Sequence, residues 1–221
     1  MSLVIAKDQQ WELFNSSLLL EVTRPNGVFT CSGVAISQDT VLTAAHCLDG
    51  EVKQVKVFDT VAYDPKATFF EIASSKIHPD YNPKVSAYLN DIAIIKLKTK
   101  LPNHIIIHPV YQKDDITGEF IRFGFGERDE KNNRTVVTPK FRYVNHPHKV
   151  IELDDYYSKS GDSGGPVFLI KDKTIYILAI HSTLSKGSQG EFSYNPLVNK
   201  YWSWINSETH KSIQDPIHQK P

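Results

Sequence analysis

The chain has 221 residues, and its 25 Lys and Arg balance its 25 Asp and Glu. A formal net charge of zero gives no electrostatic reason to expect nucleic acid or an anionic membrane as a partner. No run approaches the roughly 18 apolar residues of a membrane-spanning helix. The length allows one domain or two small ones around a substantial core.

Strand signals dominate the chain. Short segments rich in Val, Ile, Phe and Tyr alternate with clusters of turn residues such as Pro25-Asn26-Gly27 and Lys171-Asp172-Lys173. The segments expected to form strands are 17–22, 33–36, 52–58, 92–97, 119–125, 135–143, 166–170 and 174–181. Regular short strands separated by turns predict an all-β sandwich or barrel.

Three further segments complete the organisation. Residues 101–115, with two prolines and a polar end, are the best candidate for a linker between two halves. A helix is expected near residues 199–208, where Trp202 and Ile205 would form an apolar face. The polar tail 211–221 is expected to fray.

Cys31 and Cys47 are the two cysteines of the chain. A disulfide between them would close a loop of about 15 residues and stabilise the fold by roughly 3 kcal/mol. Two reduced thiols or a two-cysteine metal site are the alternatives. The disulfide reading implies an oxidising compartment, so we expect a secreted or periplasmic protein. Because residues 1–7 lack the pattern of a signal peptide, we expect that a signal was removed and a short expression start added; an intracellular protein is the alternative.

Three motifs carry groups that nucleophilic acyl transfer requires. A serine hydroxyl attacks a carbonyl only when a base takes its proton and a third group orients that base. Taken singly, each residue has an ordinary structural explanation, but their joint presence in the order His, Asp, Ser predicts this chemistry. The motifs are Leu-Thr-Ala-Ala-His-Cys ending at Cys47, Asn-Asp-Ile-Ala around Asp91, and Gly-Asp-Ser-Gly-Gly-Pro around Ser163.

Together with Cys31-Ser32-Gly33 and Gly124-Phe125-Gly126, these motifs resemble the chymotrypsin/trypsin-like serine peptidase family over about residues 4 to 205, with features of bacterial members. The resemblance implies an all-β fold of two six-stranded antiparallel β-barrels, at 4–105 and 106–221, with the active site between them and a C-terminal helix. It also implies the disulfide between the two cysteines.

The resemblance assigns a role to each catalytic residue. Ser163 would be the nucleophile, His46 the general base and then acid, and Asp91 the group that orients the imidazole. The backbone N–H groups of Gly161 and Ser163 would form the oxyanion hole. Asp162 corresponds to the aspartate that pairs with the ammonium of the mature chain, which would start near residue 4 or 5. Since residues 1–3 precede that point, the chain as written is zymogen-like or carries an artificial start.

The motifs say less about which residue the enzyme prefers before the scissile bond. Tyr157 stands where trypsins hold an aspartate, which disfavours cleavage after Arg or Lys. His181 stands where glutamyl endopeptidases place a histidine that contacts a substrate carboxylate, beside Ser182, the family serine next to the triad aspartate. Ser158 and Ser160 would add hydroxyl donors. The alternative is that His181 is an ordinary strand residue and that the preference is not for acidic residues.

Other function classes are also weighed. A non-catalytic binding protein of the same fold usually lacks a triad residue, and this chain retains all three. Serine hydrolases of the Gly-x-Ser-x-Gly type order the triad Ser, Asp, His, which excludes that assignment. No cofactor or metal site is expected, because His146-Pro147-His148 lacks a supporting ligand pattern. We expect a monomer that acts on protein or peptide substrates.

Overall fold

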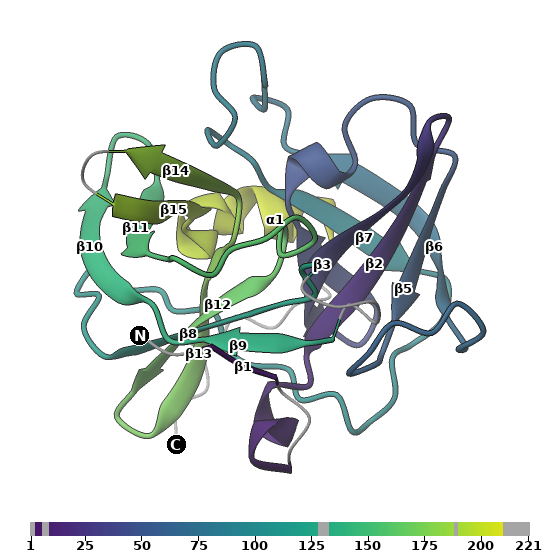
Figure 1. Ribbon diagram of the computed structural model, residues 1–221, viewed down its shortest axis with the longest axis horizontal. Helices are drawn as coiled ribbons and strands as arrows, with labels where there is room; N and C mark the ends of the chain where they lie inside the picture. The colour runs from purple at the N-terminus through teal and green to yellow at the C-terminus, as the bar shows by residue number, and fades with distance from the viewer. Residues whose placement is uncertain (1–2, 6–8, 128–132, 188–189, 210–221) are drawn as a thin grey trace.

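The computed structural model describes residues 3–5, 9–127, 133–187 and 190–209. It contains two β-rich halves, the first coloured purple to blue and the second teal to yellow in Figure 1. The tail 211–221 lies outside the described residues. No described helix is long and apolar enough to cross a membrane.

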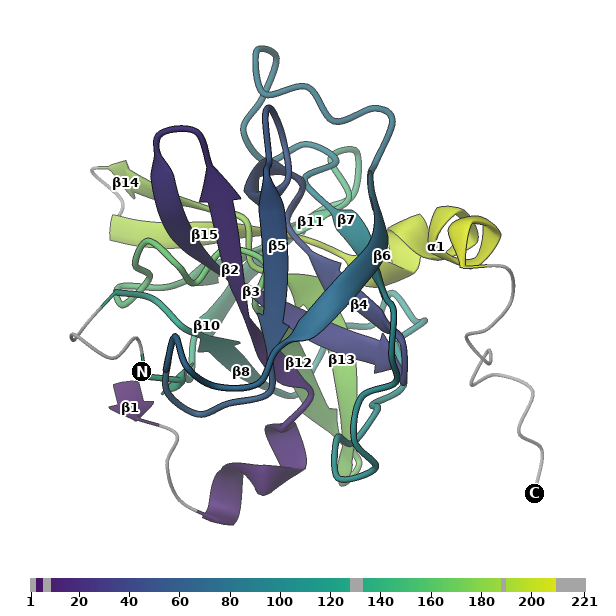
Figure 2. The same ribbon diagram turned by 90° about the vertical axis from the view of Figure 1, so that its right-hand side faces the viewer.

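The first half is a closed barrel of six antiparallel strands. Figure 2 looks onto this half, with β5 and β6 toward the viewer. Around the barrel the strands are β2 (Ser17–Arg24), β3 (Gly27–Ser37), β4 (Thr40–Thr43), β7 (Ala93–Leu97), β6 (Phe70–Ile77) and β5 (Gln54–Phe58). Its core is aliphatic, including Leu18, Leu20, Val41, Val57 and Ile95.

The second half has two antiparallel sheets. One contains, in order, β1 (Leu3–Ile5), β9 (Thr135–Val137), β8 (Glu119–Gly124), β12 (Pro166–Lys171) and β13 (Thr174–Ile180). The other contains β10 (Lys140–Asn145), β11 (Val150–Asp154), β15 (Gly190–Pro196) and β14 (Thr183–Gly187). A bridge between Ala179 and Leu197 links the sheets. The 3-10 turn η3 (Val198–Tyr201) and the helix α1 (Trp202–Glu208) follow, so the expected fold class and terminal helix are confirmed.

The start of the chain departs from the expected boundary. β1 pairs with β9, so the backbone of residues 3–5 adds a strand to the second half and not to the expected 4–105 unit. Phe14, at the end of η1 (Gln9–Phe14), stacks on Phe123 with ring centroids 4.9 Å apart and packs edge-on against Phe168. The beginning of the chain therefore contributes to the core of the second half.

Several strands differ from the sequence expectation for physical reasons. The expected strand 135–143 is two strands that belong to different sheets. β6 was missed because most of its side chains are exposed, so it lacks an apolar face. The turn after β12 was expected correctly, and there Asp172 and Lys173 both have positive φ, at 49° and 63°, as a tight hairpin turn requires.

Candidate functional site

The first part of the site is built by the pairing of β4 with β7. Thr43 lies opposite Ala93, so the residues that follow β4 and precede β7 emerge at the same end of the barrel. His46 lies there in the 3-10 turn η2 (Ala45–Cys47), and its Nδ1 is 2.7 Å from Asp91 Oδ2. The backbone N–H of His46 also donates to Asp91 Oδ1 at 2.8 Å. One carboxylate therefore fixes both the backbone and the ring of this histidine.

Asp91 is buried and is also contacted from the second half. Ser182 Oγ donates to Asp91 Oδ2 at 2.5 Å. The preceding residue Asn90 has a left-handed backbone, with φ of 56°, and its side-chain oxygen accepts a hydrogen bond from Tyr201 Oη at 3.3 Å. The turn that presents the carboxylate is thus held by residues on both sides of the interface.

Ser163 joins the same network through Ser182. Its Oγ donates to the Ser182 carbonyl at 3.5 Å, so Ser182 contacts both Ser163 and Asp91. Among the hydrogen bonds of these residues, none joins Ser163 Oγ directly to His46. Such bonds are often long before a substrate is bound and tighten in the reacting complex.

Two backbone donors flank this serine. Within the described part of the chain, the N–H groups of Gly161 and Ser163 donate to no protein acceptor. Gly161 has φ of +97°, and a Cβ there would lie 2.9 Å from the Phe125 carbonyl oxygen, so only glycine fits without strain. Gly164 has φ of +84°, and a Cβ there would overlap Thr43 Oγ1 and the Ser32 carbonyl. The loop is therefore pressed against the first half.

Ser32 on β3 was not singled out as a site residue by the sequence, although it lies within a matched motif. Its N–H donates to the Ser163 carbonyl at 2.7 Å, and its Oγ donates to the Gly161 carbonyl at 2.7 Å. The same hydroxyl accepts from the Phe125 N–H at 3.0 Å. Ser32 therefore holds two carbonyl groups of the loop that carries Ser163.

The expected specificity residues are only partly brought together. His181 is buried, and its Nε2 is 2.8 Å from Ser158 Oγ. Its Nδ1 donates to the Asn195 side-chain oxygen at 3.1 Å, because the Asn195 amide nitrogen donates to Ile151 and Ser193. Burial, and then the charge of Arg122, lower the pKa of His181 to about 4. The imidazole is therefore neutral near neutral pH and accepts the Ser158 proton.

Two other expected specificity residues, Ser160 and Tyr157, make different contacts. Ser160 is exposed, and its carbonyl accepts from the Glu127 N–H at 2.8 Å. The Tyr157 N–H donates to Asp155 Oδ1 at 3.3 Å, which ties the backbone of this residue to a buried carboxylate. Asn195 was missed by the sequence, since an asparagine late in a strand carries no distinguishing signal.

Asp162, expected to pair with an ammonium group, faces a guanidinium. Arg122 Nη1 lies 3.1 Å from Asp162 Oδ2, and both side chains are fully buried. Arg122 also donates from Nε and Nη2 to the two oxygens of Asp155, at 2.6 and 3.0 Å. The signal that was available is a lone arginine inside the apolar strand β8.

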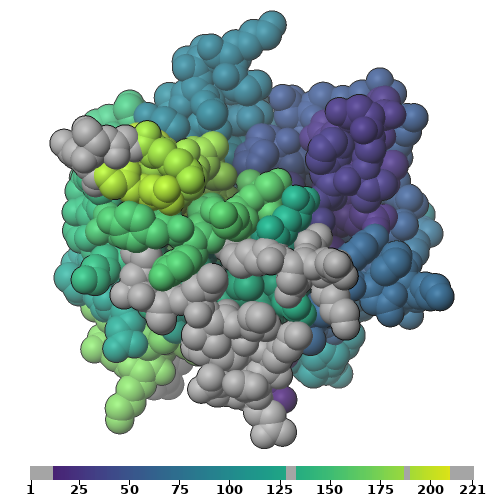
Figure 3. Space-filling view, in the orientation of Figure 1, coloured from purple at the N-terminus to yellow at the C-terminus, as the bar shows by residue number. Residues whose placement is uncertain are grey.

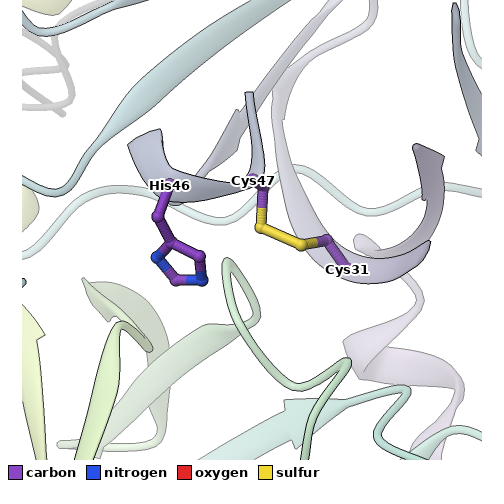
Figure 4. A group of neighbouring side chains, drawn as sticks. All are labelled: Cys31, His46 and Cys47. Carbon is purple, nitrogen blue, oxygen red and sulfur yellow. A yellow bond between two sulfur atoms is a disulfide. The ribbon is translucent and has the colours of Figure 1, made fainter. Parts of the chain in front are cut away.

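The expected disulfide is present. Cys31 on β3 is bonded to Cys47, and Figure 4 shows that His46 and Cys47 leave the same short turn on the same side, with the imidazole ring beside the disulfide. These three residues are also the described group whose potential metal-ligating atoms lie within 4.8 Å of one another. Because both sulfur atoms are used in the disulfide, the group is not a metal site.

The comparisons with known proteins agree with this geometry. The family model described as Trypsin matches residues 14–205. A trypsin of Sarcophaga bullata is 39% identical over 71 residues, which cover 31% of this chain and 27% of that protein. Granzyme M of Homo sapiens is 36% identical over 86 residues, which cover 38% of this chain and 33% of that protein. The chain thus spans about a third or less of the length of these relatives in the matched regions.

A solved structure described as an HL collagenase has the same fold. It superposes with a TM-score of 0.73 at 23% identity, over 90% of this chain and 95% of that one.

Proposed function

Because the chain belongs to the trypsin family, we propose that it is a serine endopeptidase that hydrolyses peptide bonds through an acyl-enzyme. The observation that carries the proposal is the bond from His46 Nδ1 to the buried Asp91, joined to Ser163 through Ser182. A site with this arrangement can take a proton from the serine hydroxyl and return it to a leaving group. The proposed substrates are proteins or peptides.

Each residue then has a defined step. Ser163 Oγ bonds to the carbonyl carbon while its proton passes to His46 Nε2, and the carbonyl electrons move onto the oxygen. The free N–H groups of Gly161 and Ser163 stabilise that oxyanion. When the C–N bond breaks, His46 gives the proton to the leaving amine. Water then attacks the carbonyl carbon of the acyl-enzyme while His46 takes its proton. The ester bond breaks, the proton returns to Ser163 Oγ, and the carboxylic acid is released.

Substitution of Ser163 tests the proposal. Ser163→Ala removes the nucleophile and is expected to abolish hydrolysis of a peptide ester and labelling by an organophosphonate. Ser75→Ala is the matched control, because that side chain is exposed on β6, outside the proposed site, and it is expected to retain activity. A Ser163→Ala protein that is folded and hydrolyses the ester at the wild-type rate would show that the assignment is wrong.

For the residue before the scissile bond we propose Glu or Asp. The support is the pair of His181 and Ser158, together with the absence of a carboxylate at Tyr157. Since Asn195 holds Nδ1 as a donor, a proton added at Nε2 would point toward a bound carboxylate, and the Ser158 hydroxyl would be released to donate to it. The buried, neutral state of His181 favours a second candidate, a peptidase that prefers uncharged residues.

The two candidates differ in their pH dependence. In the enzyme without substrate the pKa of His181 is about 4. The carboxylate of a bound acidic substrate would raise this pKa, so an acidic substrate binds together with a proton. The ratio of kcat/KM for paired Glu and Gln peptides should therefore rise as the pH falls from about 8 to about 5, above the ordinary pKa of Glu. The Gln peptide cancels every pH effect that the two substrates share. A flat ratio near one supports the uncharged preference, and dominant cleavage after Arg or Lys contradicts both.

The setting of the enzyme is part of the proposal. The disulfide beside His46 supports function in an oxidising compartment, which is consistent with secretion.

A further inference from the structure

We propose that Arg122 is a positioning residue that holds residues 161–163, here named the oxyanion loop, in the working conformation, so that activity does not require a free amino terminus. The inference rests on the proposed peptidase function and adds how its site is kept assembled.

Asp162 lies between the two oxyanion donors in the sequence. Its Oδ1 accepts from the Gly126 N–H at 2.8 Å, and its Oδ2 accepts from the Lys159 N–H at 3.0 Å. Because Asp162 separates Gly161 from Ser163, the position of its carboxylate decides where both amides point. Whatever fixes this side chain therefore fixes the oxyanion hole.

The buried carboxylate of Asp162 faces a positive charge. A carboxylate without exposure to solvent needs a cation or several donors. Arg122 provides a guanidinium 3.1 Å from Asp162 Oδ2. It lies in β8 opposite Val167 of β12, the strand that starts three residues after the nucleophile. The cation is thus part of the central strand of the five-stranded sheet.

The same guanidinium also binds Asp155. That contact has two hydrogen bonds, and Asp155 in turn accepts from the Tyr157 N–H. Arg122 therefore ties down both ends of the segment that runs from Asp155 to Asp162 and carries Ser158. A single ammonium group could not reproduce this planar two-sided contact.

The family resemblance implied a free ammonium group near residue 4 or 5. Val4 and Ile5 lie in β1, paired with Val136 and Thr135 of β9. β9 lies between β1 and β8 in the sheet. The backbone of these residues is therefore used in the edge of a sheet, one strand removed from the strand that carries Arg122.

The first test compares three forms of the chain: the chain beginning at Met1, one with a Gly/Ser extension before Met1, and one trimmed to begin at Val4. We expect kcat/KM and organophosphonate labelling to agree within about twofold between the first two, since no transition-state contact is lost. A loss of more than about tenfold on extension overturns the inference. If the trimmed form is labelled and the extended form is not, the peptidase function stands and the inference fails. If no form reacts, the function itself fails.

The second test is a pH profile with substitutions at Arg122. Burial lowers the pKa of Arg122, but Asp162 and Asp155 raise it above its ordinary value, and His181 is a further titratable group near it. An α-amino group has an ordinary pKa of about 8, so an enzyme that depends on one loses activity between about pH 8 and pH 10. This chain should show no such loss, and an alkaline fall that disappears on amino-terminal acetylation overturns the inference.

Arg122→Met should lower kcat by about 100-fold or more, as loss of an oxyanion donor does, with little change in KM. Arg122→Lys should restore part of kcat and introduce an alkaline fall below the ordinary lysine pKa of about 10.4, because the ammonium is buried. A folded Met variant with wild-type kcat overturns the inference. If that variant does not fold, the Lys variant decides, and a Lys variant with a flat alkaline profile overturns it.

Discussion

At the scale of single residues, Asp91 joins the two halves of the proposed site. It accepts from the His46 backbone, the His46 ring and the Ser182 hydroxyl, and it is fully buried. A carboxylate with these partners selects the imidazole tautomer that has its proton on Nδ1. That leaves Nε2 free to act as a base.

Asp91→Asn should therefore lower kcat by about 10⁴-fold while the protein stays folded, because an amide can stabilise the wrong tautomer. Steady-state kinetics with a peptide ester, together with a thermal unfolding curve, measures both parts. Asp64→Asn, on an exposed loop, is the matched control and should have wild-type kinetics. A loss in Asp91→Asn of less than about tenfold would mean that His46 is oriented by other groups.

The sequence was sufficient for some of these residues and not for others. His46, Asp91 and Ser163 lie in motifs of neighbouring residues, so their pattern is visible without a fold. Ser32 and Gly161 are 129 positions apart, and their contact depends on how the two halves dock. Arg122 was visible only as a charge in an apolar strand, since its partners come from other elements.

At the scale of elements, the turn η2 is anchored by the disulfide. Arg24 reinforces it by donating to the His46 and Cys47 carbonyls at 3.2 and 3.0 Å. The bond between Cys31 and Cys47 joins this turn to β3, the strand that carries Ser32. Both contacts hold the backbone that presents His46.

Replacing both cysteines by serine should lower the free energy of unfolding by about 3 kcal/mol, the loop-entropy value for a closed loop of this size. Urea denaturation of the oxidised protein and of the double variant measures the difference. Reductant should destabilise the wild type and leave the double variant unchanged. A difference below about 0.5 kcal/mol would indicate that the reduced loop is held equally well by its other contacts.

Elements were predicted best where burial gives a strand an apolar pattern. β2, β12 and β13 have long buried stretches and were expected close to their observed bounds. β14 was missed because it includes Ser185 and Lys186, and its backbone pairing with β15 is not encoded in an apolar face. The helix was expected at the right place, but its first residues form a 3-10 turn.

At the scale of the whole molecule, the site exists only where the two halves meet. The halves occupy opposite sides of the space-filling view in Figure 3. The bonds from Ser182 to Asp91 and from Ser32 to Ser163 cross between them, and Tyr88 stacks on Tyr194 with ring centroids 4.0 Å apart. Docking of the halves therefore brings together the residues that we propose as nucleophile, base and oxyanion donors.

The family resemblance predicted the architecture of two halves. It did not predict that β1, at the start of the chain, pairs with β9 of the second half. Residues 3–5 form three paired positions with β9, and such a short segment carries too little pattern to reveal its partner. Docking between halves is also set by many contacts distant in sequence. For these reasons the motifs indicate the proposed catalytic groups, whereas the network of contacts around these groups is visible only in the structure.

The most direct measurement is to map the adduct formed when the folded chain is treated with an organophosphonate and digested for mass spectrometry. We expect one stoichiometric adduct on Ser163, absent from Ser163→Ala and formed much more slowly in Asp91→Asn. An adduct on another residue, or no adduct on the folded chain in its extended, original or trimmed form, would show that Ser163 is not the activated nucleophile.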